Sequence, residues 1–345
     1  MLEVRTLQEI VEQPETWAAA IRSFDAAAAE VAGLFQELSP EEVIFTGCGS
    51  SYSLSMTAAT AFQKVAGLRS RAVPASEILQ FSGSVFVPGS RPLLVVSSRS
   101  GTTTETLRAL EVARRRGIAT LSLTCARRSP LARGTDLCII SPKGHEESVV
   151  MTKSFSSLLL LTLLLAANHA GGVSLRRDLR RLPALGKRVV KVALNLTGDL
   201  GADAARFVFL GAGPAHGIAW EAMLKMTEMA QRPAVAYHPL EFRHGPIAMV
   251  EPGTVVVFFG TRAGARLEAD LAMDLQRHGA TVVSLRDEWQ GAEGLDVDVA
   301  LGVRLDDEAR CLLYLPFAQT LAYHRALGAG LDPDRPRHLR SVVRL

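Results

Sequence analysis

Two halves of this sequence repeat one another, and the repeat limits the possible folds more than any other feature. An apolar run that ends in Gly-x-Gly at 211–213 matches an earlier one at 47–49, an offset of 164 (211 minus 47). The stretch Gly-Ala-Thr-Val-Val-Ser-Leu at 279–285 matches Gly-Ile-Ala-Thr-Leu-Ser-Leu at 117–123, an offset of 162 (279 minus 117). Ordered matches at nearly constant offset indicate a duplicated structural unit.

Within each copy, short apolar runs alternate with helical patterns. In the first copy we expect strands at 42–46, 71–74, 93–96, 119–124 and 137–140, and helices that include 53–66 and 75–81. Such alternation is typical of an α/β fold with a mostly parallel sheet and helices on both faces. Pro14 is expected to interrupt the helical pattern near the N-terminus. We divide the chain into an N-terminal helical segment (1–30), a first α/β unit (31–170), a helical linker (171–200) and a second α/β unit with the C-terminal tail (201–345).

A dense cluster of hydroxyl residues follows the strand at 93–96. The loop 98–103 reads Ser-Arg-Ser-Gly-Thr-Thr and leads into a helical pattern. The first amides of a helix lack partners inside the helix and attract anions, so this loop suits a phosphomonoester. A Ser/Thr-rich N-cap is the alternative, although the loop has more hydroxyls than one cap needs. The second copy has Gly-Thr-Arg-Ala-Gly at 260–264 instead, which predicts one phosphate site per chain.

Several classes of function are disfavoured. The loop lacks the Gly-Lys-Ser/Thr of ATP-binding loops and the Gly-x-Gly-x-x-Gly of dinucleotide-binding folds. A net charge of +3 on 345 residues is too small to indicate nucleic acid. The longest apolar stretch, 158–167, is about half of a ~20-residue membrane span and predicts a buried core helix. Four cysteines without a Cys-x-x-Cys pair, and an N-terminus without a signal peptide, favour the cytoplasm.

The second half contains charged residues at helical spacing. Glu221, Lys225 and Glu228 fall at i, i+4 and i+7, so they share one helix face. A solvated Glu-to-Lys ion pair is the alternative interpretation. His244 follows in a turn, His-Gly-Pro.

Taken together, these motifs resemble the double sugar-isomerase (SIS) domain proteins, closest to the isomerase half of glucosamine-6-phosphate synthase and to the SIS-type glucosamine-6-phosphate deaminases. The motifs are Gly-Cys-Gly-Ser-Ser-Tyr (47–52), Ser-Arg-Ser-Gly-Thr-Thr (98–103), Glu-Ser-Val-Val-Met-Thr-Lys-Ser-Phe (147–155), Glu-x-x-x-Lys-x-x-Glu (221–228) and Glu-Phe-Arg-His-Gly-Pro (241–246). The resemblance implies two flavodoxin-like halves, a homodimer with a shared active site, a tail that closes on that site, and a hexose 6-phosphate or amino-sugar 6-phosphate ligand, with no metal and no cofactor.

The resemblance also implies a role for each matched residue. Glu228 would move a proton between C1 and C2, which needs a carboxylate, while Glu221 and Lys225 position the open chain. His244 would reach in from the neighbouring subunit and open the ring, which needs a group that titrates near neutrality. The phosphate would be bound by Ser50, Ser51, Ser98, Arg99, Ser100 and Thr103. The sugar would be bound by Cys48, Gly49, Val149, Lys153 and Arg340.

Three positions depart from the synthase pattern. Arg99 replaces a glutamine in the phosphate loop, and Met151 replaces a serine near the sugar. In the tail, Arg340 stands in place of a lysine that forms an imine with the keto sugar. Because an arginine stays protonated, covalent imine chemistry is not expected from Arg340.

The expected function is an isomerising deaminase that converts glucosamine 6-phosphate and water to fructose 6-phosphate and ammonia. The chain starts directly with the sugar domain, and the N-terminal cysteine of a glutaminase domain is missing. A fructosamine-6-phosphate deglycase or another sugar-phosphate isomerase is an alternative. A non-catalytic sugar-phosphate sensor is another, and such a protein would need the phosphate loop but neither Glu228 nor His244.

Overall fold

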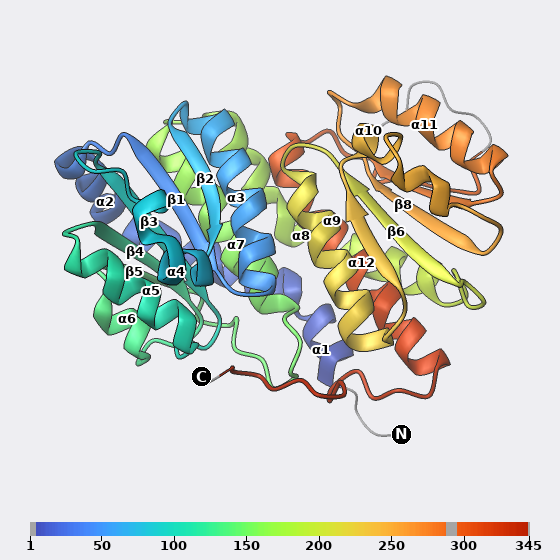
Figure 1. Ribbon diagram of the computed structural model, residues 1–345, viewed down its shortest axis with the longest axis horizontal. Helices are drawn as coiled ribbons and strands as arrows, with labels where there is room; N and C mark the ends of the chain where they lie inside the picture. The colour runs from blue at the N-terminus through green and yellow to red at the C-terminus, as the bar shows by residue number, and fades with distance from the viewer. Residues whose placement is uncertain (1–4, 288–294, 344–345) are drawn as a thin grey trace. The chain divides into compact units, whose positions relative to one another are not determined.

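The computed structural model describes residues 5–287 and 295–343, which form two compact units (Figure 1). The first unit contains Val11–Ala184 and the segment that starts at Arg340. The second contains Leu185–Leu339 and the segment that ends at Ile10. The beginning of the predicted segment 1–30, the end of the predicted unit 201–345 and residues 288–294 lie outside the described residues.

The first unit is a parallel sheet of five strands in the order β2-β1-β3-β4-β5, with helices on both faces (Figure 1). Its strands are β1 (Glu42–Gly47), β2 (Arg69–Pro74), β3 (Pro92–Ser98), β4 (Ala119–Thr124) and β5 (Leu137–Ile140). Its helices are α2 (Gln13–Leu38), α3 (Ser50–Ala66), α4 (Ala75–Val85), α5 (Thr104–Arg115), α6 (Pro130–Gly134) and α7 (Lys153–His169). The long helix α8 (Val173–Thr197) carries the chain from this unit into the next.

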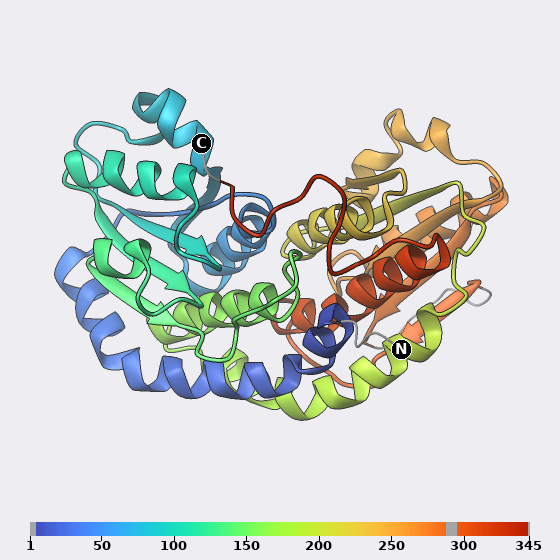
Figure 2. The same cartoon turned by 90° about the horizontal axis from the view of Figure 1, so that it is seen from below.

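Two layers of helices bury the first sheet. On one face, Ile44 and Leu94 of the sheet pack against Ile78, Leu110 and Leu131 from α4, α5 and α6. On the other face lie α2, α3 and α7, and Figure 2 shows α2 in blue next to α7 in green. Nearly the whole of α7 is buried, which is typical of a helix that is apolar on all sides. The apolar stretch 158–167 is therefore a core helix, as expected.

The N-terminal region is interrupted near Pro14, as expected. Helix α1 ends at Val11, and α2 begins at Gln13. The proline lies in the first turn of α2, where a helix leaves its backbone amides without partners in any case. From there α2 runs without a break to Leu38.

The second unit repeats the topology of the first. Its parallel sheet has the order β10-β9-β8-β6-β7, so β6 and β8 take the places of β1 and β3. Its strands are β6 (Arg206–Gly211), β7 (Ala234–Tyr237), β8 (Thr254–Phe259), β9 (Thr281–Arg286) and β10 (Val297–Ala300). Its helical elements are α1 (Arg5–Val11), α9 (Ala215–Lys225), η1 (Met226–Ala230), α10 (Pro239–Phe242), η2 (Pro246–Met249), α11 (Ala265–Arg277) and α12 (Asp307–Gly328). The predicted fold class, two tandem α/β units with parallel sheets, is confirmed.

Candidate functional site

The loop after β3 forms a tight, hydroxyl-lined turn. Between the end of β3 at Ser98 and the start of α5, Gly101 has a φ of +61°, a conformation that favours glycine. The Ser98 hydroxyl accepts a hydrogen bond from the Gly101 amide at 3.1 Å, and the Ser100 hydroxyl accepts one from the Thr102 amide at 3.2 Å. Thr103 occupies the N-cap position of α5, but its side chain makes no capping hydrogen bond. A single N-cap therefore does not account for the hydroxyls of this loop.

A second turn lies beside this loop. Because β1 and β3 are adjacent parallel strands, their carboxyl ends meet at the same edge of the sheet. Helix α3 begins at Ser50, earlier than expected, so Ser50 and Ser51 are buried in its first turn. The Cys48 Sγ lies 3.5 Å from the Thr106 Oγ1 of α5 and joins the two turns. Burial raises the pKa of the Cys48 thiol, which is therefore neutral at pH 7. Gly49 lies between Cys48 and Ser50 in the same turn. The predicted residues of the two turns therefore lie at one edge of the sheet.

Arg99 points toward a neighbouring loop and the C-terminal tail. Its guanidinium donates to the Glu146 carboxylate at 3.2 Å and to the carbonyl oxygens of residues 148–150 at 2.9 to 3.3 Å. It also donates to the Ser341 carbonyl oxygen at 3.1 Å. The arginine thus holds three segments of the first unit together, and phosphate binding by its guanidinium stays a prediction.

Glu146 is a key residue that the sequence interpretation missed. Its fully buried carboxylate accepts hydrogen bonds from the Thr152 amide at 2.6 Å, the Thr152 hydroxyl at 2.8 Å and the Ser154 amide at 3.1 Å. It therefore caps the N-terminus of α7, where a negative charge is favourable. The only signal in the sequence was an acidic residue before an apolar helix. Through this cap, Glu146 fixes the start of α7, where Lys153 lies, while its partner Arg99 holds the Val149 carbonyl oxygen.

The predicted sugar-binding wall is only partly accessible. The Lys153 ammonium donates to the Glu12 carboxylate at 2.7 Å and is mostly buried. The Met151 sulfur lies 4.0 Å from the Ser51 hydroxyl. The structure thus places residue 151 next to the turn that contains Ser51, while Lys153 already has a partner.

The C-terminal tail lies on the hydroxyl loop 98–103 and on the start of α5. The Val343 carbonyl oxygen is 3.5 Å from the Thr104 amide, the first amide of α5, and Ser341 contacts Arg99. Arg340 is exposed and directly precedes this contact. The structure therefore brings the predicted tail residue into the first unit, close to the hydroxyl loop.

In the second unit, Glu221, Lys225 and Glu228 form a buried ionic cluster. The Lys225 Nζ lies 3.4 Å from a Glu221 oxygen and also pairs with Glu228. The side chains of Glu221 and Lys225 are 0% and 1% exposed, and that of Glu228 is 20% exposed. A solvated ion pair is therefore the wrong interpretation of this spacing, and Glu228 is the member of the cluster that solvent reaches.

The charge of Lys225 is held in place by its two partners. Burial alone lowers the pKa of the Lys225 ammonium, but the Glu221 and Glu228 carboxylates more than compensate, so this pKa lies above its ordinary value. Lys225 is therefore a fixed cation. Directly after it, the helix widens into the π-helical turn η1, and Glu228 lies in that turn. Such turns occur frequently at functional sites, and no pattern in the residues predicts this one.

His244 lies on a different element, in the turn between α10 and η2. The following Gly245 has a φ of +115°, and the His244 side chain is exposed. His244 lines a cavity of about 570 Å³ together with Leu240, Arg243, Leu267, Asp270, Met273, Asp274 and Arg277. The imidazole is therefore accessible from outside its own unit.

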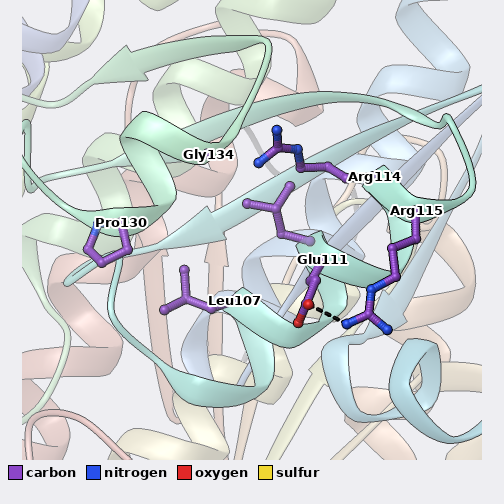
Figure 3. A pocket seen from close by; sticks show the side chains of 7 residues that line it. Leu107, Glu111, Arg114, Arg115, Pro130 and Gly134 are labelled. Carbon is purple, nitrogen blue, oxygen red and sulfur yellow. Dashed lines mark hydrogen bonds and ion pairs between the residues drawn. The ribbon is translucent and has the colours of Figure 1, made fainter.

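The structure thus forms two groups of predicted site residues, one in each unit. The hydroxyl turns, Arg99, Val149, Lys153 and Arg340 belong to the first unit, and the ionic cluster and His244 belong to the second. A surface pocket of about 480 Å³ between α5 and α6 contains none of these residues, and Figure 3 shows its Glu111 paired with Arg115. No cluster of His, Cys, Asp or Glu suited to a metal ion occurs within residues 5–287 and 295–343. Within the same ranges, no helix is long and apolar enough to cross a membrane.

Comparisons with known proteins agree over most of the chain. The family model described as SIS domain matches residues 26–168 and 202–324. Over 346 residues the chain is 30% identical to glutamine–fructose-6-phosphate aminotransferase (isomerizing) of Methanothermobacter thermautotrophicus, which covers 98% of this chain. Only 57% of that relative is covered, so the chain spans little more than half of its length.

Two solved structures extend the comparison. Glucosamine-6-phosphate deaminase from Thermotoga maritima is 32% identical, with a TM-score of 0.79 over 94% of this chain and 99% of that one. Tagatose-6-phosphate ketose/aldose isomerase from Escherichia coli has a TM-score of 0.88 over 98% of this chain and 97% of that one. Its sequence identity is 24%, so this second likeness shows the fold alone.

The contacts of Arg99 predict a large effect on stability. Arg99→Gln leaves the buried Glu146 carboxylate without its cation, so we expect the free energy of unfolding to fall by about 3 kcal/mol. Urea unfolding measures this change. The matched control is Arg108→Gln on the exposed side of α5, which should stay within about 0.5 kcal/mol of the parent. Equal effects of the two substitutions would contradict the conclusion that Arg99 holds three segments of the first unit together.

Proposed function

The chain belongs to the SIS domain family, and on this basis we propose that it is an isomerising deaminase of amino-sugar 6-phosphates. Glucosamine 6-phosphate and water then give fructose 6-phosphate and ammonia. The 32% identity with the Thermotoga maritima deaminase, over nearly the full length of both chains, supports this substrate class.

The observation that carries the proposal is the buried cluster of Glu221, Lys225 and Glu228. In the proposed reaction, Glu228 takes the proton from C2 of the open-chain amino sugar and returns it at C1 through an enolamine. Water then hydrolyses the imine at C2 and releases ammonia. The permanent charge of Lys225 stabilises the negative charge that develops on the oxygen at C1, and Glu221 holds Lys225 in place.

The proposed mechanism involves no imine between protein and sugar. Arg340 cannot lose its proton to become a nucleophile. The raised pKa of Lys225 keeps that amine protonated, and Lys153 is paired with Glu12. The lysines in the matched motifs are thus engaged as cations.

The phosphate group of the substrate binds at the two hydroxyl turns of the first unit. Ser98, Ser100 and Thr103 supply donors from one turn, and Ser50 and Ser51 supply donors from the other. The parallel pairing of β1 and β3, which brings the turns to one edge of the sheet, supports this assignment.

The active enzyme is a homodimer in this proposal. His244 from one subunit opens the sugar ring at the site of the other. The exposure of His244 at the surface of its own unit supports this role.

The first prediction concerns phosphate binding. Ser100→Ala should weaken binding of fructose 6-phosphate at least tenfold, because a hydrogen bond to a charged group contributes about 1.5–3 kcal/mol. Calorimetry measures the affinity, and binding of unphosphorylated fructose should not change. Ser90→Ala, in an exposed loop, is the matched control. An equal loss of affinity for both sugars would reject the phosphate assignment.

The second prediction concerns the proton shuttle. Glu228→Gln keeps the shape of the side chain but cannot accept a proton, so turnover should fall by ~10² or more while substrate binding is retained. Ammonia release from glucosamine 6-phosphate measures turnover, with the exposed Glu111→Gln as control.

The same assay separates the alternatives. Full activity of Glu228→Gln would assign this helix to structure and favour the sensor. If the parent enzyme releases an amine only from fructosamine 6-phosphates, it is a deglycase. If it interconverts aldose and ketose phosphates without releasing ammonia, it is a simple isomerase.

The third prediction concerns the shared site. Glu228→Gln and His244→Ala proteins should each be inactive, and mixing them under conditions of subunit exchange should restore part of the activity through hybrid dimers. Complete absence of recovery, with exchange verified by mass spectrometry, would count against a histidine donated by the neighbouring subunit.

A further inference from the structure

The second unit has a loop at the position that the phosphate loop occupies in the first. Strands β3 and β8 are the central strands of sheets with the same topology. The loop 260–264 follows β8 and leads into α11, just as the loop 98–103 follows β3 and leads into α5. The helix α11 therefore presents its first amides where an anion is expected to bind.

A carboxylate of the chain itself already lies in this loop. Glu268, in the first turn of α11, is 5% exposed and folds back onto the loop. Its carboxylate accepts hydrogen bonds from the Thr261 hydroxyl at 3.1 Å and the Thr261 amide at 3.3 Å. The Thr261 hydroxyl in turn accepts one from the Gly264 amide at 3.1 Å.

The backbone approaches this carboxylate as closely as it would approach a ligand. A Cβ atom at Gly264 would lie 2.3 Å from a Glu268 oxygen and 2.9 Å from the Thr261 hydroxyl. A side chain at this position would therefore displace the carboxylate. The close fit, together with the hydrogen bonds, makes the loop a built pocket with an occupant.

The surrounding charges keep the occupant an anion at neutral pH. Burial raises the pKa of Glu268 to about 6, while the hydrogen bonds from Thr261 and the charge of Arg310 oppose this rise. Arg310 is buried and pairs with Asp287 at 2.7 Å and with Asp307. At pH 7.5 the pocket therefore contains a carboxylate.

We propose that the loop 260–264 is the anion pocket of the second copy and that Glu268 occupies it permanently. The duplicated fold thus has two equivalent anion pockets, and one of them is filled from within. This inference explains why a phosphoester is expected only in the first unit, and it does not depend on the proposed reaction. Removing the Glu268 carboxylate should open the second pocket to a small carboxylate such as acetate.

Chemical rescue tests the proposal. Glu268→Ala removes the Cγ atom and the carboxylate of Glu268, which together have the size of one acetate ion. The melting temperature (Tm) of this variant at pH 7.5 should be below that of the parent. Replacing chloride by acetate at constant ionic strength should then raise the Tm of Glu268→Ala by about 3 °C more than that of the parent. Glu268→Gln, which leaves no space, is the matched control and should show no extra rise. An equal response of all three proteins would overturn the proposal.

A second measurement applies even if Glu268→Ala does not fold. Thr261→Val keeps the shape of the loop but removes the hydroxyl donor, so the pKa of Glu268 should rise above about 6. A pH titration of the carboxyl carbon by NMR follows this change in the full-length protein. An unchanged pKa would show that the loop does not bind the carboxylate. A Thr227→Val protein, altered at an exposed site, controls for general effects.

Discussion

The amides at the start of a buried helix need hydrogen-bond acceptors, and this requirement organises both units. Leaving such a group unsatisfied costs about 1–3 kcal/mol, so each helix that starts inside the protein must find a partner. Glu146 provides it for α7, and Glu268 accepts a hydrogen bond from the Thr261 amide in the loop before α11. At α5 the loop offers hydroxyl groups, and the Thr104 amide donates to the Val343 carbonyl oxygen at 3.5 Å. Under our proposal, the phosphate of the substrate binds at this third helix start.

The ionic cluster of the second unit shows how burial and charge together select a protonation state. Desolvation favours the neutral amine of Lys225, but two carboxylates within ion-pair distance favour the ammonium and prevail. The cation is then fixed. Glu228, which lies in the widened turn η1, is more exposed than Glu221, and in the proposed mechanism this difference separates the proton shuttle from the residue that holds Lys225.

The fold could be predicted from the sequence to a large extent, because strand and helix patterns are local. The apolar runs at β3 and α7 depend on neighbouring residues alone, and the repeat between the two copies can be found by comparing the sequence with itself. Pro14 marks the boundary between α1 and α2, because a proline breaks a helix in its interior but fits in its first turn.

Contacts between distant residues could not be predicted in the same way. The direction of Arg99 depends on Glu146 and on carbonyl oxygens that lie some fifty residues further along the chain, and no pattern near Arg99 indicates them. The same holds for Glu146. Its role as a cap depends on hydrogen bonds from the Thr152 and Ser154 amides, which no local pattern indicates. The spacing of Glu221, Lys225 and Glu228 was visible, but only the structure distinguishes a buried cluster from a solvated one.

The two copies therefore share the same strand order but differ in the side chains of the loops that follow β3 and β8. In the first unit, small hydroxyl side chains line the loop after the central strand. In the second, the Glu268 carboxylate lies in the equivalent loop, and a side chain at Gly264 would displace it. A unit that supplies its own anion cannot bind a second phosphoester at that position, so its remaining polar residues are available for other chemistry. Under the proposed function, the first copy binds the charged end of the ligand, and the buried charges on α9 and η1 in the second copy provide the groups that move a proton.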